Sequence, residues 1–122
     1  MLSSEQRKQF FQLVRTLKKE HPIGKVTVRF VEKEDLDGAE ADSGRTKKWF
    51  VIRIGKHLNT VNAQYALCEE WAHAMVWDKI DTDKLFEKDL PENVLLRKLH
   101  CKEWALSYMN TVNIRSDILC KS

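Results

Sequence analysis

Three side chains near the middle of the sequence have the types and spacing of a metal centre carried by one helix. Glu69 and His73 are four residues apart, so a helix would place both side chains on the same face. Glu70 lies at the flank of that face. Carboxylate oxygen and imidazole nitrogen are both zinc ligands, and a glutamate beside a bound metal can activate water. The spacing therefore allows a metal site at Glu69 and His73, with Glu70 as a candidate catalytic residue beside it.

The residues around this triplet predict the helix that would carry it. Thr60 or Asn62 can cap its start, and apolar residues continue to about Lys79. We expect such a helix to be largely buried, so that its carboxylates and histidine need partners. A metal ion would be one such partner. A Glu and His pair at this spacing is also common as a plain surface contact, so the spacing alone leaves both interpretations open.

A third ligand is available later in the chain. His100 follows His73 in a segment that predicts a last helix, from about Glu92 to at least Asn110. Three protein ligands would leave a coordination position open for water, as catalytic zinc requires. Because Glu69 is a carboxylate, manganese or iron would also suit the site. The expected cofactor is zinc, with another divalent transition metal, or no metal, left open.

Three more residues are candidates for the surroundings of this site. Glu103 could orient His100 or simply be solvated. Cys68 could approach the metal through its thiolate, or pack as a small buried residue. Tyr108, or else Tyr65, could stabilise an oxyanion, although tyrosines on apolar helices usually belong to the core.

The remaining elements predict an α+β fold in a single domain, 1–122. Helical spacing of apolar residues indicates a first helix from about Ser4, its expected N-cap, to Lys19. Strict alternation indicates strands over Lys25–Glu32 and Trp49–Ile54, which we expect to pair antiparallel in a small sheet. The acidic and polar residues 34–47 are expected to form a surface loop over the site, with room for a further strand.

Composition gives no support to several classes of function. The 122 residues carry 21 Lys and Arg against 18 Asp and Glu, with both signs scattered, so nucleic-acid binding is not indicated. No apolar run approaches the roughly 18 residues that cross a bilayer, so no membrane association is expected. The N-terminus lacks a signal-peptide pattern, and an odd count of 3 cysteines favours reduced thiols. The expected location is the cytoplasm, and the oligomeric state stays open.

The central motif resembles that of a known group of enzymes. Leu67 to Trp77 reads L-C-E-E-W-A-H-A-M-V-W, and this is similar to the active helix of SprT-like and related small zincin domains, many of them encoded by phages. Their helix commonly reads L-x-H-E-W-A-H-A-x-x-W. Their later helix brings a third histidine, often followed four residues on by an aromatic residue, as in His100 and Trp104. The resemblance covers the order of elements over nearly the whole chain, but only these motifs in detail.

The resemblance implies a zincin-like minimal domain in which an N-terminal helix and a small sheet precede a metal-site helix and a C-terminal ligand helix. It implies that His73 and His100 bind zinc and that Glu70 is the general base, whereas Glu69 replaces the usual first histidine. The implied function is metal-dependent peptide hydrolysis, in the host cytoplasm if the protein is phage-encoded. An extended peptide is expected to pair with the strand Trp49–Ile54.

Two further functions remain open because of the glutamate at the first ligand position. The chain could be a catalytically inactive pseudoenzyme that keeps the zincin scaffold as a protein-binding module. It could also act on another protein through surface contacts alone, without using Glu69, Glu70, His73 or His100.

Overall fold

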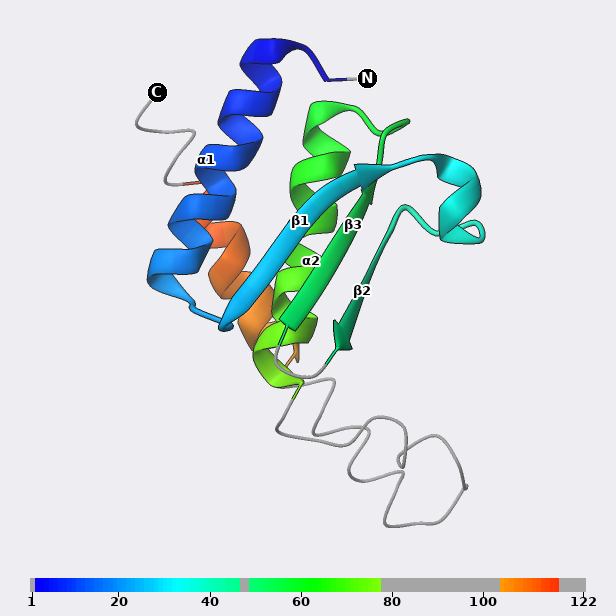
Figure 1. The fold of residues 1–122 in the computed structure, drawn as a ribbon. Coiled ribbons are helices and arrows are strands. Elements are labelled where there is room, and N and C mark those ends of the chain that lie inside the picture. Colours follow the sequence, from blue (N-terminus) through cyan, green and yellow to red (C-terminus); the bar gives the residue numbers. More distant parts are fainter. Residues whose placement is uncertain (1, 47–48, 78–103, 117–122) are drawn as a thin grey trace.

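The computed structural model describes residues 2–46, 49–77 and 104–116. The elements follow each other as a long helix, a strand, a short 3₁₀ helix, two strands and a second long helix, and residues 104–116 are again helical (Figure 1). Their bounds are α1 Ser4–Glu20, β1 Lys25–Val31, η1 Lys33–Leu36, β2 Ala41–Thr46, β3 Trp49–Gly55 and α2 Thr60–Val76.

The N-cap of helix α1 lies one residue before the predicted one. Ser3, not Ser4, is the N-cap, and it forms a capping box in which the Gln6 backbone N–H donates to Ser3 Oγ at 3.2 Å. The Gln6 side chain accepts from the Ser3 backbone N–H at 3.0 Å. Phe10, Leu13, Val14 and Leu17 are buried, as their spacing predicted. The turn after the helix uses Gly24 at a φ of 82°, which glycine adopts without strain.

The sheet is mixed rather than antiparallel. Its strand order is β1-β3-β2, and β3 pairs parallel with β1 but antiparallel with β2. The predicted antiparallel pairing of the first strand with Trp49–Ile54 is therefore wrong. The reason is the extra strand β2, which reverses the chain direction between β1 and β3.

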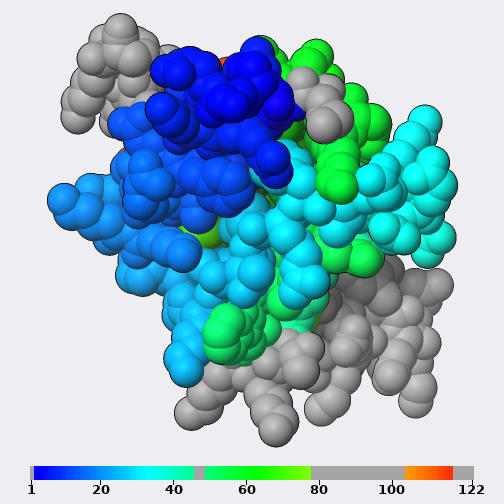
Figure 2. Space-filling view, turned by 45° about the horizontal axis from the view of Figure 1, so that its top comes forward, coloured from blue at the N-terminus to red at the C-terminus, as the bar shows by residue number. Residues whose placement is uncertain are grey.

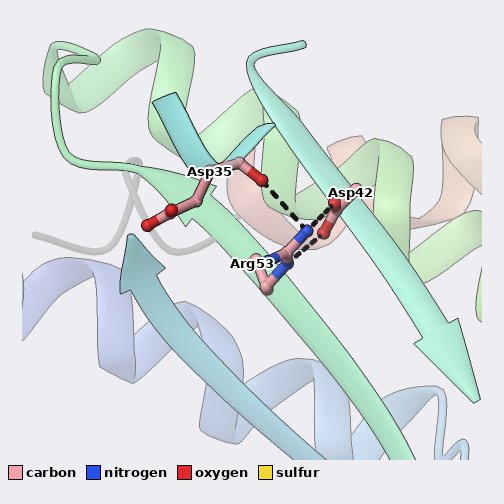
Figure 3. Close-up of polar contacts among 3 residues, drawn as sticks. All are labelled: Asp35, Asp42 and Arg53. Carbon is pink, nitrogen blue, oxygen red and sulfur yellow. Dashed lines mark hydrogen bonds and ion pairs between the residues drawn. The ribbon is translucent and has the colours of Figure 1, made fainter. Parts of the chain in front are cut away.

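The segment 34–47, predicted as a surface loop, instead contains part of η1 and the whole of β2. Arg53 of β3 holds these two elements together (Figure 3). Its Nε donates to Asp42 Oδ1 of β2 at 2.8 Å, and its Nη2 donates both to Asp42 Oδ2 and to the Asp35 carbonyl of η1. This two-pronged ion pair raises the pKa of Arg53 through the hydrogen bond and the charge of Asp42.

Helix α2 begins at a different cap from either predicted one, and it ends earlier. Asn59 is the N-cap, accepting from the Asn62 backbone N–H at 2.8 Å, and the helix ends at Val76 rather than near Lys79. Nine of its 17 residues are buried, so the predicted burial of this helix is confirmed.

Three helices and one sheet enclose the core. Figure 1 shows α2 behind the strands, with helix 104–116 (orange) between α2 and α1. On the molecular surface α1 adjoins β1 (Figure 2). In the interior, the fully buried ring of Phe10 of α1 lies 4.9 Å from the ring of Phe30 of β1. Trp71 of α2 is fully buried, and its Nε1 donates to the His21 carbonyl at 2.9 Å. Among the described residues, none of the helices is both long and apolar enough to cross a bilayer.

Helix 104–116 runs antiparallel to α2. Trp104 contacts the second half of α2, Thr111 bonds to Cys68, and Arg115 donates to Gln64 Oε1 at 2.9 Å. The last helix was predicted to run from about Glu92 to at least Asn110. Its observed part continues past Asn110 to residue 116, and its predicted beginning lies outside the described residues.

Candidate active site

Helix α2 is covered on almost every side, yet Glu69 and His73 reach the surface. The sheet, α1 and helix 104–116 bury most of its residues, and within Thr60–Val76 only Val61, Asn62, Glu69 and His73 are exposed. Because Glu69 and His73 are one helical turn apart, their side chains emerge from the same face. The two side chains predicted as ligands are therefore accessible to a metal ion from solvent.

Glu70 leaves this face and turns toward the edge strand β2. Its carboxylate accepts a hydrogen bond from the Ser43 hydroxyl, which lowers the pKa of Glu70, but partial burial outweighs this and raises the pKa above its usual range. The nearby charge of Asp42 also raises it. Ser43 pairs in register with the fully buried Ile52, so both face the helices. The predicted general base thus lies between α2 and the strand edge.

The rings of His73, Trp104 and Tyr108 lie in a row on the side of α2 that carries His73. The imidazole of His73 lies 5.3 Å from the ring of Trp104 at a tilt of 31°, and Trp104 stacks on Tyr108 at 5.2 Å with an angle of 6°. Trp104 Nε1 also donates to the Glu69 carbonyl at 3.4 Å. Helix 104–116 therefore contacts both predicted ligand positions of α2.

The charges around Glu69 favour a cation. Partial burial raises the pKa of Glu69, the carboxylates of Glu70 and Glu40 raise it further, and only His73 lowers it. A carboxylate and an imidazole on one exposed face are donors that divalent transition metals accept, so the residues present fit such an ion. In the part of the chain that the structure describes, no three acidic, cysteine or histidine side chains group closely enough to hold a metal.

Two of the predicted site residues, His100 and Glu103, lie outside the described residues. The two tyrosines flank Glu69 from different elements. Tyr65 is one turn before Glu69 on α2 and is covered by the guanidinium of Arg115, 4.5 Å from the ring centroid. Tyr108 stacks on Trp104, and its pKa is raised by partial burial and then by the charge of Glu69.

Cys68 points away from the exposed face and into the contact with helix 104–116. Its Sγ donates to the Thr111 carbonyl at 3.6 Å, while Thr111 Oγ1 donates to the Cys68 carbonyl at 3.2 Å. Burial raises the pKa of Cys68 from an ordinary 9.0 to about 11, although the side chain of Thr111 lowers it somewhat. The thiol is therefore part of the packing between α2 and helix 104–116.

We expect Cys68 to resist thiol reagents in the folded protein. With Cys101 and Cys120 replaced by serine, the protein should react with Ellman's reagent at pH 8 only after unfolding. Because the fold favours the neutral thiol, its contribution to stability is complete below about pH 9 and falls as pH rises through about 11. Rapid labelling of the native protein, at the rate seen in denaturant, would contradict the burial of this side chain.

No pattern in the sequence indicated Ser43 as a residue of the site. It lies in the segment Ala41–Thr46, whose Asp, Ser and Gly residues are depleted or neutral in strands. The ladder with β3 and the ion pair of Asp42 with Arg53 form this strand, and both are tertiary contacts. The stacking of Trp104 on His73 was also missed, although the sequence motif included Trp104.

Comparison of the chain with protein-family models, with curated proteins and with solved structures found no match.

Proposed function

We propose that this protein is a metal-dependent peptidase whose active face is the exposed side of α2. The observation that supports this most is the way three residues of the motif, Glu69, Glu70 and His73, point in two different directions from one helix. Glu69 and His73 reach solvent on a helix that is otherwise covered, and Glu70 turns to the neighbouring strand. Glu69 and His73 are thus available as metal ligands, and Glu70, adjacent to Glu69, is available as a general base for amide hydrolysis at a metal centre.

Each residue has a defined task in this proposal. Glu69 and His73 would hold the metal, with His100 as the predicted third ligand. When bound, the metal would supply a Lewis acid that polarises the scissile carbonyl and acidifies water. Glu70 takes the proton of the attacking water and passes it to the amine nitrogen as the C–N bond breaks. Its raised pKa brings the carboxyl closer to the range in which a group both accepts and returns a proton.

The substrate is an extended peptide, or a protein segment that can become extended. Strand Trp49–Gly55, predicted as the docking edge, is the central strand and has neighbours on both sides. Strand β2 is at the edge of the described sheet and carries Ser43, the partner of Glu70. A peptide pairing with the outer side of β2 would add a strand next to the general base.

The test is the metal content of the untagged protein together with cleavage of a denatured protein substrate. We expect one equivalent of a divalent transition metal, lost in Glu69→Ala and His73→Ala but retained in His57→Ala, an exposed histidine outside the site. Metal-free wild-type protein that cannot be loaded with zinc, manganese or iron would overturn the proposal.

A second function is favoured by one specific observation, the glutamate at the first ligand position. If the site holds no metal, the same edge strand β2 remains available to bind a peptide, and the protein would be a zincin-like binding module. Glu69→His, which restores H-E-W-A-H, separates the two functions. If the wild type is free of metal and the variant binds it, the binding module is supported. If both proteins bind metal, the peptidase is supported.

A further inference from the structure

Trp104 contacts α2 at both predicted ligand positions, although it belongs to a different helix. Its ring lies against the imidazole of His73, and its Nε1 donates to the backbone carbonyl of Glu69. Its other face is supported by Tyr108, nearly parallel to it. Trp104 is itself only half-buried, so this arrangement is not explained by filling the core.

We propose that Trp104 is a positioning residue that fixes the orientation of the His73 imidazole. This inference rests on the proposed function, because the orientation of the imidazole affects activity when His73 binds a metal. The pair consists of a half-buried indole and an exposed imidazole at a ring distance of 5.3 Å.

The physical reason is side-chain entropy. An exposed histidine on a helix samples several χ1 and χ2 rotamers, and metal binding must select one of them. A ring that packs against the imidazole at a tilt of 31° removes the rotamers that would clash with it. Tyr108 packs on the other face of Trp104 and keeps it against His73. The hydrogen bond from Trp104 Nε1 to the backbone carbonyl of Glu69 holds the indole at the other ligand position. Groups that orient metal ligands in this way typically change metal affinity by about 10–100-fold.

The experiment compares Trp104→Leu, Trp104→Phe and a matched control, Leu106→Ala. Leu106 lies on the same helix and is 57% exposed, so its loss tests for general damage to the helix. The affinity for Co²⁺ is measured by competition with a chelator. The χ1 averaging of His73 and the ring-current shift of its imidazole protons are measured by NMR at one pH, without metal. Thermal unfolding shows that each variant is folded.

We expect Trp104→Leu to lose about 10–100-fold in Co²⁺ affinity, to average χ1 of His73 and to lose the ring-current shift. Trp104→Phe, which keeps a stacking ring, should retain most of all three, and Leu106→Ala should match the wild type. Metal affinity unchanged in a folded Trp104→Leu would overturn the inference while leaving the proposed peptidase intact.

Failure of the proposed function has a different signature. If the wild type binds no metal, the proposed peptidase fails and the inference depends on the NMR readouts alone. A single His73 rotamer that becomes averaged in Trp104→Leu still supports Trp104 as its positioning residue. An unchanged rotamer distribution in that variant overturns it.

Discussion

Glu70→Gln is expected to lower the rate of peptide cleavage by about 10²–10⁴-fold, the usual contribution of a general acid–base residue. Glutamine has nearly the same shape as glutamate and can still accept the hydrogen bond of Ser43, but it cannot take a proton from water. Metal content and thermal stability should therefore stay close to those of the wild type. The measurement is kcat for a quenched-fluorescence peptide, with metal analysis of the same preparation.

Glu34→Gln provides the matched control, because Glu34 is an exposed glutamate on η1. Its rate should equal that of the wild type. Full activity in Glu70→Gln would show that Glu70 is not the base. Loss of metal in that variant, in parallel with loss of activity, would instead place Glu70 among the ligands.

Trp71→Ala is expected to reduce the free energy of unfolding by about 3–5 kcal/mol, as for other large buried aromatic residues. Trp71 is fully buried between α2 and the rest of the core, and its Nε1 bond to the His21 carbonyl anchors α2 to the end of α1. Truncation would leave a large cavity and an unpaired carbonyl. Urea unfolding followed by circular dichroism would measure the loss.

Two further variants divide this effect into its parts. Trp71→Phe keeps most of the ring but removes the N–H donor, so it should cost about 1–3 kcal/mol. Trp49→Ala removes a tryptophan that is 47% exposed and should cost less than either change at Trp71. A larger loss at Trp49 than at Trp71 would contradict the packing described above.

The helices and the two apolar strands were predictable because their signals are local. In Trp49–Gly55, alternate residues Phe50, Ile52 and Ile54 are buried, as the alternation requires. In α1, the spacing of four apolar residues determines which face meets the sheet. The predicted N-cap of α1 was wrong by one residue because Ser3 and Ser4 are adjacent. The predicted N-cap of α2 was wrong because Asn59, Thr60 and Asn62 are all suitable cap residues.

The sheet topology was not predictable, because its decisive strand has no local signal. Ala41–Thr46 is polar and contains a glycine, so neither hydrophobicity nor propensity favours a strand. It becomes one by pairing with β3 and by the ion pair of Asp42 with Arg53, which is 11 residues away in sequence. The sequence left room for a strand in this segment but did not place it. The expected antiparallel pairing of β1 with β3 and the expected docking edge on β3 were therefore both wrong.

For this protein the sequence alone determined the types of the chemical groups and their order along one helix. The spacing of Glu69, Glu70 and His73 follows from helical geometry and needs no knowledge of the fold. The tertiary structure decided where those groups point, since exposure depends on which neighbouring elements cover each face of α2. Glu70 faces Ser43 and His73 faces Trp104 because β2 and helix 104–116 pack on two different sides of that helix. Such contacts depend on long-range packing, which local sequence patterns do not encode.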